Sequence, residues 1–268
     1  MLSPPQEPSI DRRAWLRQKL RPNGRVLWRL MTEDRLYFKQ LLSGRDFAQQ
    51  DPFATQMMNF VYLVGDRETS EAVIVDPAYD PRGILDVLAA DEMNCVGMLG
   101  THYHADHVGG SMMGLEVAGA AELLQEIDVP LHVQAAEVDY VKQVTGLEDD
   151  ALVTHDGSSM LQVGVIEIDL LHTPGHTPGS QSFLVENRLV AGDTLFLQGC
   201  GRTDLPGGDA QQLYYSLTKV LAKVPDDAVL FPGHQYSPAP SATMARTRAE
   251  NAVFAPKSAE QWMAMFGS

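Results

Sequence analysis

The sequence predicts one compact α/β domain built on two β-sheets, and three observations support this prediction. The 268 residues are 44% hydrophobic and 21% charged, a composition typical of globular domains and unlike that of disordered chains. Short apolar runs typical of strands alternate with segments of helical spacing. Groups of His, Asp and Gly directly follow several of these runs, as expected where α/β folds gather functional groups at the carboxyl ends of strands.

Apolar periodicity and turn signals define the individual elements. Strands are predicted at 36–38, 60–64, 72–75, 96–99, 131–133, 163–171, 181–185, 188–191 and 229–231. Helices are predicted at 84–90, 116–126, 135–144, 213–224, 244–252 and 259–265. The turn-like segment 65–70 indicates a hairpin, and the strand 96–99 leads directly into a histidine-rich turn.

The first 34 residues differ from the rest and are predicted to form a basic N-terminal extension, 1–34, ahead of a main domain at 35–268. They begin Pro-rich and continue with a helical pattern over 10–20 that ends at a Pro-Asn-Gly break. Residues 1–50 carry ten Lys/Arg against five Asp/Glu, whereas the rest of the chain carries 10 against 30.

Net charge and hydropathy exclude several classes of partner. The formal net charge of −15 is concentrated in the main domain, which therefore repels nucleic acid and anionic membranes. No run approaches the roughly 18 apolar residues of a membrane-spanning helix, and the N-terminus lacks a secretory signal pattern. We expect a cytoplasmic protein without nucleic-acid or membrane partners, and the sequence leaves a homodimer open.

The histidine-rich turn is the strongest functional signal. His102-Tyr103-His104-Ala105-Asp106-His107 contains three imidazoles and one carboxylate. Alternation along a loop can direct His102 and His104 toward one metal ion and Asp106 and His107 toward a second. Imidazole and carboxylate are common ligands of Zn, Fe and Mn.

Three further candidate ligands lie in loops after predicted strands. His176 lies in Thr-Pro-Gly-His-Thr-Pro-Gly, a stiff loop that would complete a three-histidine site with the first pair. Asp193 follows an apolar strand, and its two carboxylate oxygens allow it to bridge two cations. His234, in Phe-Pro-Gly-His, would close the second site.

Taken together, these motifs resemble the metallo-β-lactamase superfamily. They are His-x-His-x-Asp-His at 102–107, Pro-Gly-His-Thr-Pro-Gly at 174–179, Gly-Asp-Thr-Leu-Phe at 192–196 and Pro-Gly-His at 232–234. The resemblance covers residues 36–268 and implies a four-layer αβ/βα sandwich of two mixed sheets flanked by helices. Residues 199–204 (Gly-Cys-Gly-Arg-Thr-Asp) and 248–251 (Arg-Ala-Glu-Asn) resemble the glyoxalase II and persulfide dioxygenase branch, whose members act on glutathione-linked sulfur compounds.

The resemblance implies a catalytic domain that hydrolyses a thioester, lactone or related ester of a small molecule, and glutathione-linked compounds are among the substrates it implies. Two Zn²⁺ ions per chain, roughly 3.5–4 Å apart, would lower the pKa of a bridging water and polarise the substrate carbonyl. Asp106 would be the catalytic residue, because it can both ligate a cation and orient the bridging hydroxide.

Two alternatives stay open. Thr203-Asp204 and the short C-terminal tail are similar to persulfide dioxygenases, whereas segments 108–110 and 233–234 are more similar to the hydrolases. A dioxygenase would hold one Fe²⁺ with two histidines and an aspartate, here His102 or His104, His176 and Asp193. Mixed Zn, Fe and Mn occupancy also fits these donors. A metal-binding protein without turnover is the alternative of a different class.

Three residues are candidates for contact with the substrate. The planar guanidinium of Arg202 suits a substrate carboxylate, or else forms an ion pair with Asp204 or Asp209. Tyr103 and Tyr236 flank ligands, and each either lines the pocket or packs in the protein.

Two further residues are candidates for supporting the ligands. Asp76 follows a strand and would accept a hydrogen bond from a ligating histidine, or else cap a turn. His172 lies close enough in sequence to His176 to support it. The segment 111–128 departs from both families and is expected to reshape the mouth of the site.

Overall fold

The computed structural model describes residues 35–112, 114–256 and 258–267. The basic extension 1–34 and its predicted helix over 10–20 lie outside the described residues, so both stay predictions. Within the described part, no helix combines the length and apolar character needed to cross a membrane.

The first sheet has the strand order β1-β2-β3-β4-β7-β8. Strands β1, β2 and β3 pair antiparallel, whereas β3, β4, β7 and β8 pair parallel. Their bounds are β1 Leu36–Leu42, β2 Phe60–Asp66, β3 Glu71–Val75, β4 Asn94–Leu99, β7 Leu131–Gln134 and β8 Leu152–His155. The predicted hairpin of β2 and β3 is confirmed.

The second sheet has the order β14-β13-β12-β11-β10-β9 and is also mixed, because β12 and β13 pair parallel while the other neighbours pair antiparallel. Its strands are β9 Ser159–Val163, β10 Ile166–His172, β11 Gln181–Val185, β12 Arg188–Gly192, β13 Val229–Pro232 and β14 Ala242–Thr243. A small hairpin of β5 (Gly110–Met112) and β6 (Leu115–Val117) stands apart from both sheets.

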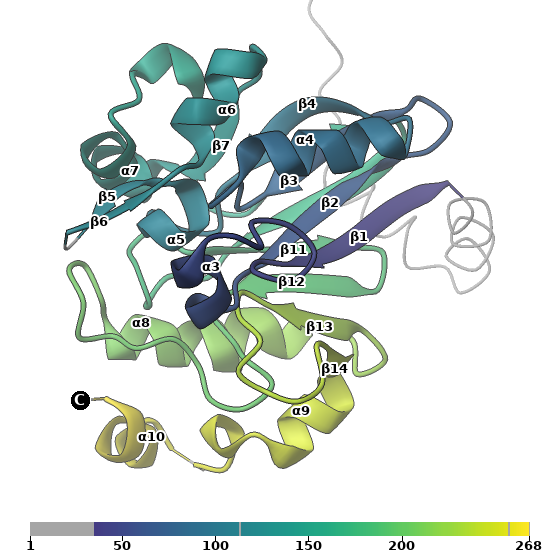
Figure 1. Cartoon of the computed structure of the whole chain (residues 1–268). Coiled ribbons are helices and arrows are strands. Elements are labelled where there is room, and N and C mark those ends of the chain that lie inside the picture. Colours follow the sequence, from purple (N-terminus) through teal and green to yellow (C-terminus); the bar gives the residue numbers. More distant parts are fainter. Residues whose placement is uncertain (1–34, 113, 257, 268) are drawn as a thin grey trace, which may run out of the picture.

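Helices cover the outer face of each sheet (Figure 1). Those on the first sheet are α4 Pro81–Ala90, α6 Ala120–Glu126 and α7 Val138–Thr145, and those on the second are α8 Ala210–Tyr215, α9 Met244–Glu250 and α10 Ala259–Phe266. Helix α4 begins at the predicted Asp80-Pro81 signal, where the Asp80 carboxylate accepts the backbone N–H of Gly83 at 2.9 Å.

The buried faces of the strands define four layers. Along β2, Val61 and Leu63 pack toward the helices of the first sheet, while the alternate residues Phe60, Tyr62 and Val64 pack between the sheets. Because both faces of β2 are buried, its sequence is a continuous apolar run instead of an alternating one. The predicted four-layer αβ/βα sandwich is confirmed.

Two predicted elements are wrong in their extent. The helix expected over 116–126 begins only at Ala120, because Glu116 and Val117 belong to the β5–β6 hairpin and the Glu122 carboxylate caps the helix by accepting the N–H of Gly119. The strand expected over 163–171 is two strands, β9 and β10, which turn at Gly164 with φ of +56°.

The C-terminal half also departs from expectation at several points. The helix predicted over 213–224 begins at Ala210, capped by Asp209, and ends in a π-helical turn over Ser216–Val220 and a 3₁₀ turn over Leu221–Lys223. Strands β8 and β14 and the short helix α3 (Pro52–Met57) were not predicted, because each is too short for periodicity to identify.

Candidate metal centre

Four candidate ligands lie on the turn that follows β4. His102 and His104 precede the one-turn helix α5 (Ala105–Val108), and Asp106 and His107 lie on it. The three imidazoles are buried, and the Asp106 side chain is 11% exposed. The start of α5 therefore divides the turn into two pairs of donors.

The other three candidate ligands follow strands of the second sheet. His176 follows β10, Asp193 follows β12 directly, and His234 follows β13. The loop before His234 passes so close to Asp193 that a β-carbon on Gly233 would lie 2.2 Å from Asp193 Oδ1. Only glycine fits before His234, which explains the Pro-Gly-His motif.

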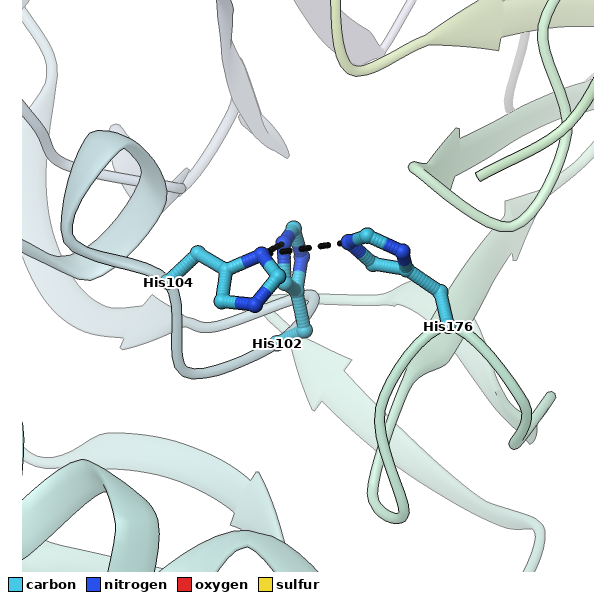
Figure 2. Close-up of side chains that lie close together, drawn as sticks. All are labelled: His102, His104 and His176. Carbon is cyan, nitrogen blue, oxygen red and sulfur yellow. Dashed lines mark hydrogen bonds between the residues drawn. The ribbon is translucent and has the colours of Figure 1, made fainter. Parts of the chain in front are cut away.

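The donor atoms of all seven residues converge. His104 Nδ1 lies 2.9 Å from His102 Nε2 and 3.1 Å from His176 Nε2, and Figure 2 shows these three rings turned toward one another. Three overlapping sets each bring their donor atoms within 4.8 Å of one another. The sets are His102, His104 and His176; His102, His107 and Asp193; and Asp106, His107 and His234.

Asp193 lies between the two ends of this cluster. Its Oδ1 is 3.5 Å from His107 Nε2, and its Oδ2 is 3.7 Å from His176 Nε2 and 3.3 Å from His234 Nε2. The carboxylate thus faces histidines of both outer sets, as a bridging ligand must.

Asp76 fixes two of the ligating rings. Its Oδ2 lies 2.8 Å from His107 Nδ1 and accepts a hydrogen bond from the Thr101 hydroxyl at 2.8 Å. Because that hydroxyl donates to Asp76, its oxygen is free to accept from His102 Nδ1, 3.0 Å away. The outer nitrogens of both rings therefore carry the protons, and their Nε2 lone pairs face the centre.

Backbone carbonyls fix two more rings in the same way. His176 Nδ1 lies 2.7 Å from the carbonyl oxygen of Arg202, and His234 Nδ1 lies 2.9 Å from that of Met57. A carbonyl only accepts, so these outer nitrogens also donate, and the lone pair of each neutral ring is on Nε2. In their neutral forms the four rings direct Nε2 lone pairs into one buried space, which favours a cation there.

The buried carboxylate of Asp193 also favours a cation in this space. Asp193 Oδ1 is buried and has no hydrogen-bond partner among the described residues. A buried carboxylate oxygen without a partner is costly unless a positive charge is close by. The donor set of five imidazoles and two carboxylates is the chemistry that divalent Zn, Fe or Mn prefers.

The pKa values of the cluster follow from burial and charge. Burial, followed by the neighbouring His176, lowers the pKa of His104 to about 3. Burial also acts to lower the pKa of His107, but the carboxylates of Asp106 and Asp193 outweigh it and raise that pKa to about 10. A cation must displace the proton of the His107 ring, so metal binding by Asp106, His107 and His234 is expected to weaken as the pH falls.

The candidates for substrate contact lie in different surroundings. Tyr103 is buried, and its hydroxyl donates to the carbonyl of Pro206 at 2.9 Å, while its contact with a substrate stays a prediction. Tyr236 is 53% exposed and stacks on the His234 ring at 4.7 Å, so it borders the centre. Arg202 forms a two-point ion pair with Asp204, both exposed, while its carbonyl holds His176.

His172 lies beside the loop that carries His176. Its Nε2 lies 3.0 Å from the carbonyl oxygen of Pro178, two residues beyond His176. This contact supports the loop, and a role of His172 in supporting the His176 ring stays a prediction.

Sequence reasoning missed three residues that support the cluster, of which only Asn59 contacts a candidate ligand directly. Asn59 donates to Asp106, Tyr79 donates to Asn59, and Glu137 joins two ligand loops. The only sequence signal is a polar residue inside apolar surroundings, as for Asn59 directly before β2 and Glu137 at the start of the 135–144 helix pattern.

Comparison with known proteins agrees with this geometry. The family model described as the metallo-beta-lactamase superfamily matches residues 54–234. The chain is 30% identical to the mitochondrial persulfide dioxygenase ETHE1 of Homo sapiens, across 72% of this chain and 70% of that protein. It is 33% identical to a probable hydroxyacylglutathione hydrolase of Schizosaccharomyces pombe, across 67% of this chain and 64% of that protein.

Among solved structures, ETHE1 from Myxococcus xanthus superposes with a TM-score of 0.70 at 28% identity, covering 87% of this chain and 90% of the other. These relatives are the two kinds of enzyme that the sequence resembles, a hydrolase and a dioxygenase. The match spans more than half of the chain and includes every candidate ligand. The chain therefore belongs to the metallo-β-lactamase superfamily of metal-dependent enzymes.

Proposed function

We propose that the protein is a dinuclear metal-dependent hydrolase that cleaves a thioester, lactone or related ester, with a glutathione-linked thioester as the leading substrate class. The observation that carries the proposal is the second donor set, Asp106, His107 and His234, beside the three-histidine set. A centre for one cation needs only one of these sets. Two such sets, with the Asp193 carboxylate between them, support two cations.

Two Zn²⁺ ions would supply an activated water and polarise the substrate carbonyl. The protein's own groups supply the rest. The Asp193 carboxylate lies between the two sides of the cluster, with Oδ1 facing His107 and Oδ2 facing both His176 and His234. Asp106 is the candidate catalytic residue, since its carboxylate lies beside His107 and His234, where it can orient the attacking water and accept its proton.

Aromatic side chains beside His234 support a substrate with an apolar arm. Phe196 and Tyr236 pack edge to face at 5.1 Å, and Tyr236 presents its exposed ring next to His234. Arg202 is proposed to meet a substrate carboxylate by exchanging Asp204 for it, because both side chains are exposed and their pairing is therefore weak.

A mononuclear iron persulfide dioxygenase is the second candidate function. The named similarity to persulfide dioxygenases in Homo sapiens and Myxococcus xanthus favours it. His102 or His104 with His176 and Asp193 would hold the single iron. A protein that binds metal without turnover receives no support from either relative.

Metal analysis and substrate turnover separate the two functions. Protein prepared without added metal is expected to contain close to two zinc ions per chain and to hydrolyse S-lactoylglutathione or a homoserine lactone. One iron per chain, with oxygen uptake on glutathione persulfide and no hydrolysis, would overturn the hydrolase proposal. Two zinc ions without turnover of either ester would refute the substrate class while leaving the two-cation centre intact.

A further inference from the structure

A buried hydrogen-bond relay runs from Tyr79 through Asn59 to the carboxylate of Asp106. The Tyr79 hydroxyl donates to Asn59 Oδ1 at 2.8 Å, and Asn59 Nδ2 donates to Asp106 Oδ2 at 3.1 Å and to the Asp106 carbonyl oxygen at 2.9 Å. Asn59 and Tyr79 are buried, with exposed fractions of 1% and 6%.

The direction of the relay follows from the groups themselves. The Asp106 carbonyl oxygen only accepts, and so does its ionised carboxylate, so the amide of Asn59 must turn its NH₂ group toward them. Its oxygen then faces Tyr79 and must receive the hydroxyl proton. The alternative orientation would bring the amide oxygen against two other oxygens in a buried site, which is unfavourable.

Asn59 contacts only one side of the metal centre. Its Nδ2 lies 3.4 Å from His107 Nε2 and 3.5 Å from His234 Nε2, so it is close to the donor atoms of the whole second set. Its backbone forms a bridge with His234. The first set is held by other groups, the Thr101 hydroxyl and the Arg202 carbonyl.

The backbone at the start of the relay is unusual. Tyr79 has φ of +76°, a left-handed conformation that is uncommon and unfavourable for an aromatic residue. Its N–H donates to the Ala118 carbonyl at 2.7 Å, which holds this conformation. Strained residues of this kind persist where the surrounding structure requires their side-chain position.

We propose that Asn59, oriented by Tyr79, is a positioning residue that fixes the Asp106 carboxylate as a ligand of the second cation and so makes the centre dinuclear. The proposal rests on the two-cation hydrolase proposed above. Asn59 holds Oδ2 beside His234 Nε2, 3.4 Å away. Without the amide, the carboxylate is free to rotate, and the second set loses a pre-oriented donor while the first set keeps all of its contacts.

The test is a Zn²⁺ titration of metal-free protein in competition with a chromophoric chelator, which gives an affinity for each bound equivalent. Tyr79→Phe deletes only the hydroxyl. It is expected to weaken the affinity for the second Zn²⁺ equivalent by roughly 10–100-fold, as removal of a group that orients a ligand commonly does. Asn59→Leu is expected to lose the second equivalent. In both variants the first equivalent stays as tight as in the wild type.

Tyr37→Phe is the matched control. Tyr37 is also buried, and its hydroxyl donates to Asp91, which is not part of the centre, so this variant is expected to bind both equivalents normally. Urea unfolding of all variants separates lost stability from lost metal. If Asn59→Leu fails to fold, Tyr79→Phe decides alone.

The outcomes distinguish this proposal from the proposed function. The relay would be overturned if the wild type, Tyr79→Phe and Asn59→Leu all bind two Zn²⁺ equivalents tightly. That result would leave the dinuclear hydrolase standing. Equal weakening of both equivalents would also overturn it, because that result indicates general disruption. A wild type that binds one equivalent would overturn the dinuclear hydrolase, and the relay with it.

Discussion

Replacing His107 with Ala is expected to leave one bound cation per chain and to reduce ester or thioester hydrolysis by roughly 10³-fold or more, since the lost cation removes several kcal/mol of charge stabilisation. His107 belongs to two of the three donor sets, but not to the set of His102, His104 and His176. A dioxygenase centre built on that set and Asp193 would keep much of its activity.

His155→Ala is the control for this variant. His155 lies at a distance from the centre, where it pairs with His132 at 3.0 Å and with Ser159 at 2.9 Å, so it tests the loss of a structural imidazole. The measurement is metal per chain together with kcat/KM. If His107→Ala hydrolyses at the wild-type rate, or loses both cations, the assignment of His107 to the second cation alone is wrong.

Replacing Glu137 with Gln is expected to destabilise the protein by on the order of 3 kcal/mol, because buried donors would lose their acceptor. One carboxylate oxygen accepts from the Tyr103 N–H at 2.7 Å and the Thr177 hydroxyl at 2.7 Å, and the other accepts from the Gly179 N–H at 2.6 Å. The NH₂ group of Gln would face at least one of these donors, so the isosteric change cannot restore the contacts.

Glu137 also ties the loop of His102 and His104 to the loop of His176. Its loss is therefore expected to weaken metal binding in the three-histidine set as well as the fold. Glu148→Gln is the control, because Glu148 is 83% exposed and meets Lys142 only at 3.8 Å. Urea unfolding of both variants is the measurement, and a Glu137→Gln midpoint equal to that of Glu148→Gln would refute the structural role of Glu137.

The features predicted best from the sequence are those encoded locally. Strands such as β2 and β12 are apolar runs between turn signals, and the fold buries both faces of β2. The seven candidate ligands were found because they lie in short motifs after strands. The rule that strand ends meet at one edge then brings distant segments together.

The errors arise where one residue changes the local structure. Gly164 turns a predicted strand into a hairpin, and Gly119 together with Glu122 delays the start of α6. Periodicity averages over many residues and so cannot detect such a change.

The missed residues act through contacts that are distant in sequence. Asn59 meets Asp106 across 47 residues, and Glu137 meets Tyr103 across 34. Neither partner can be inferred without the fold. For the same reason, the hydrogen bond from the Tyr103 hydroxyl to the Pro206 carbonyl could not be inferred from the sequence.

The most direct test of the two-cation centre is anomalous X-ray diffraction at the zinc absorption edge from crystals of the zinc-loaded protein. Two peaks per chain are expected, roughly 3.5–4 Å apart as in other two-metal sites. One peak is expected among His102, His104 and His176, and the other among Asp106, His107 and His234, with Asp193 between them. A single peak, or peaks away from these side chains, would refute the two-cation centre.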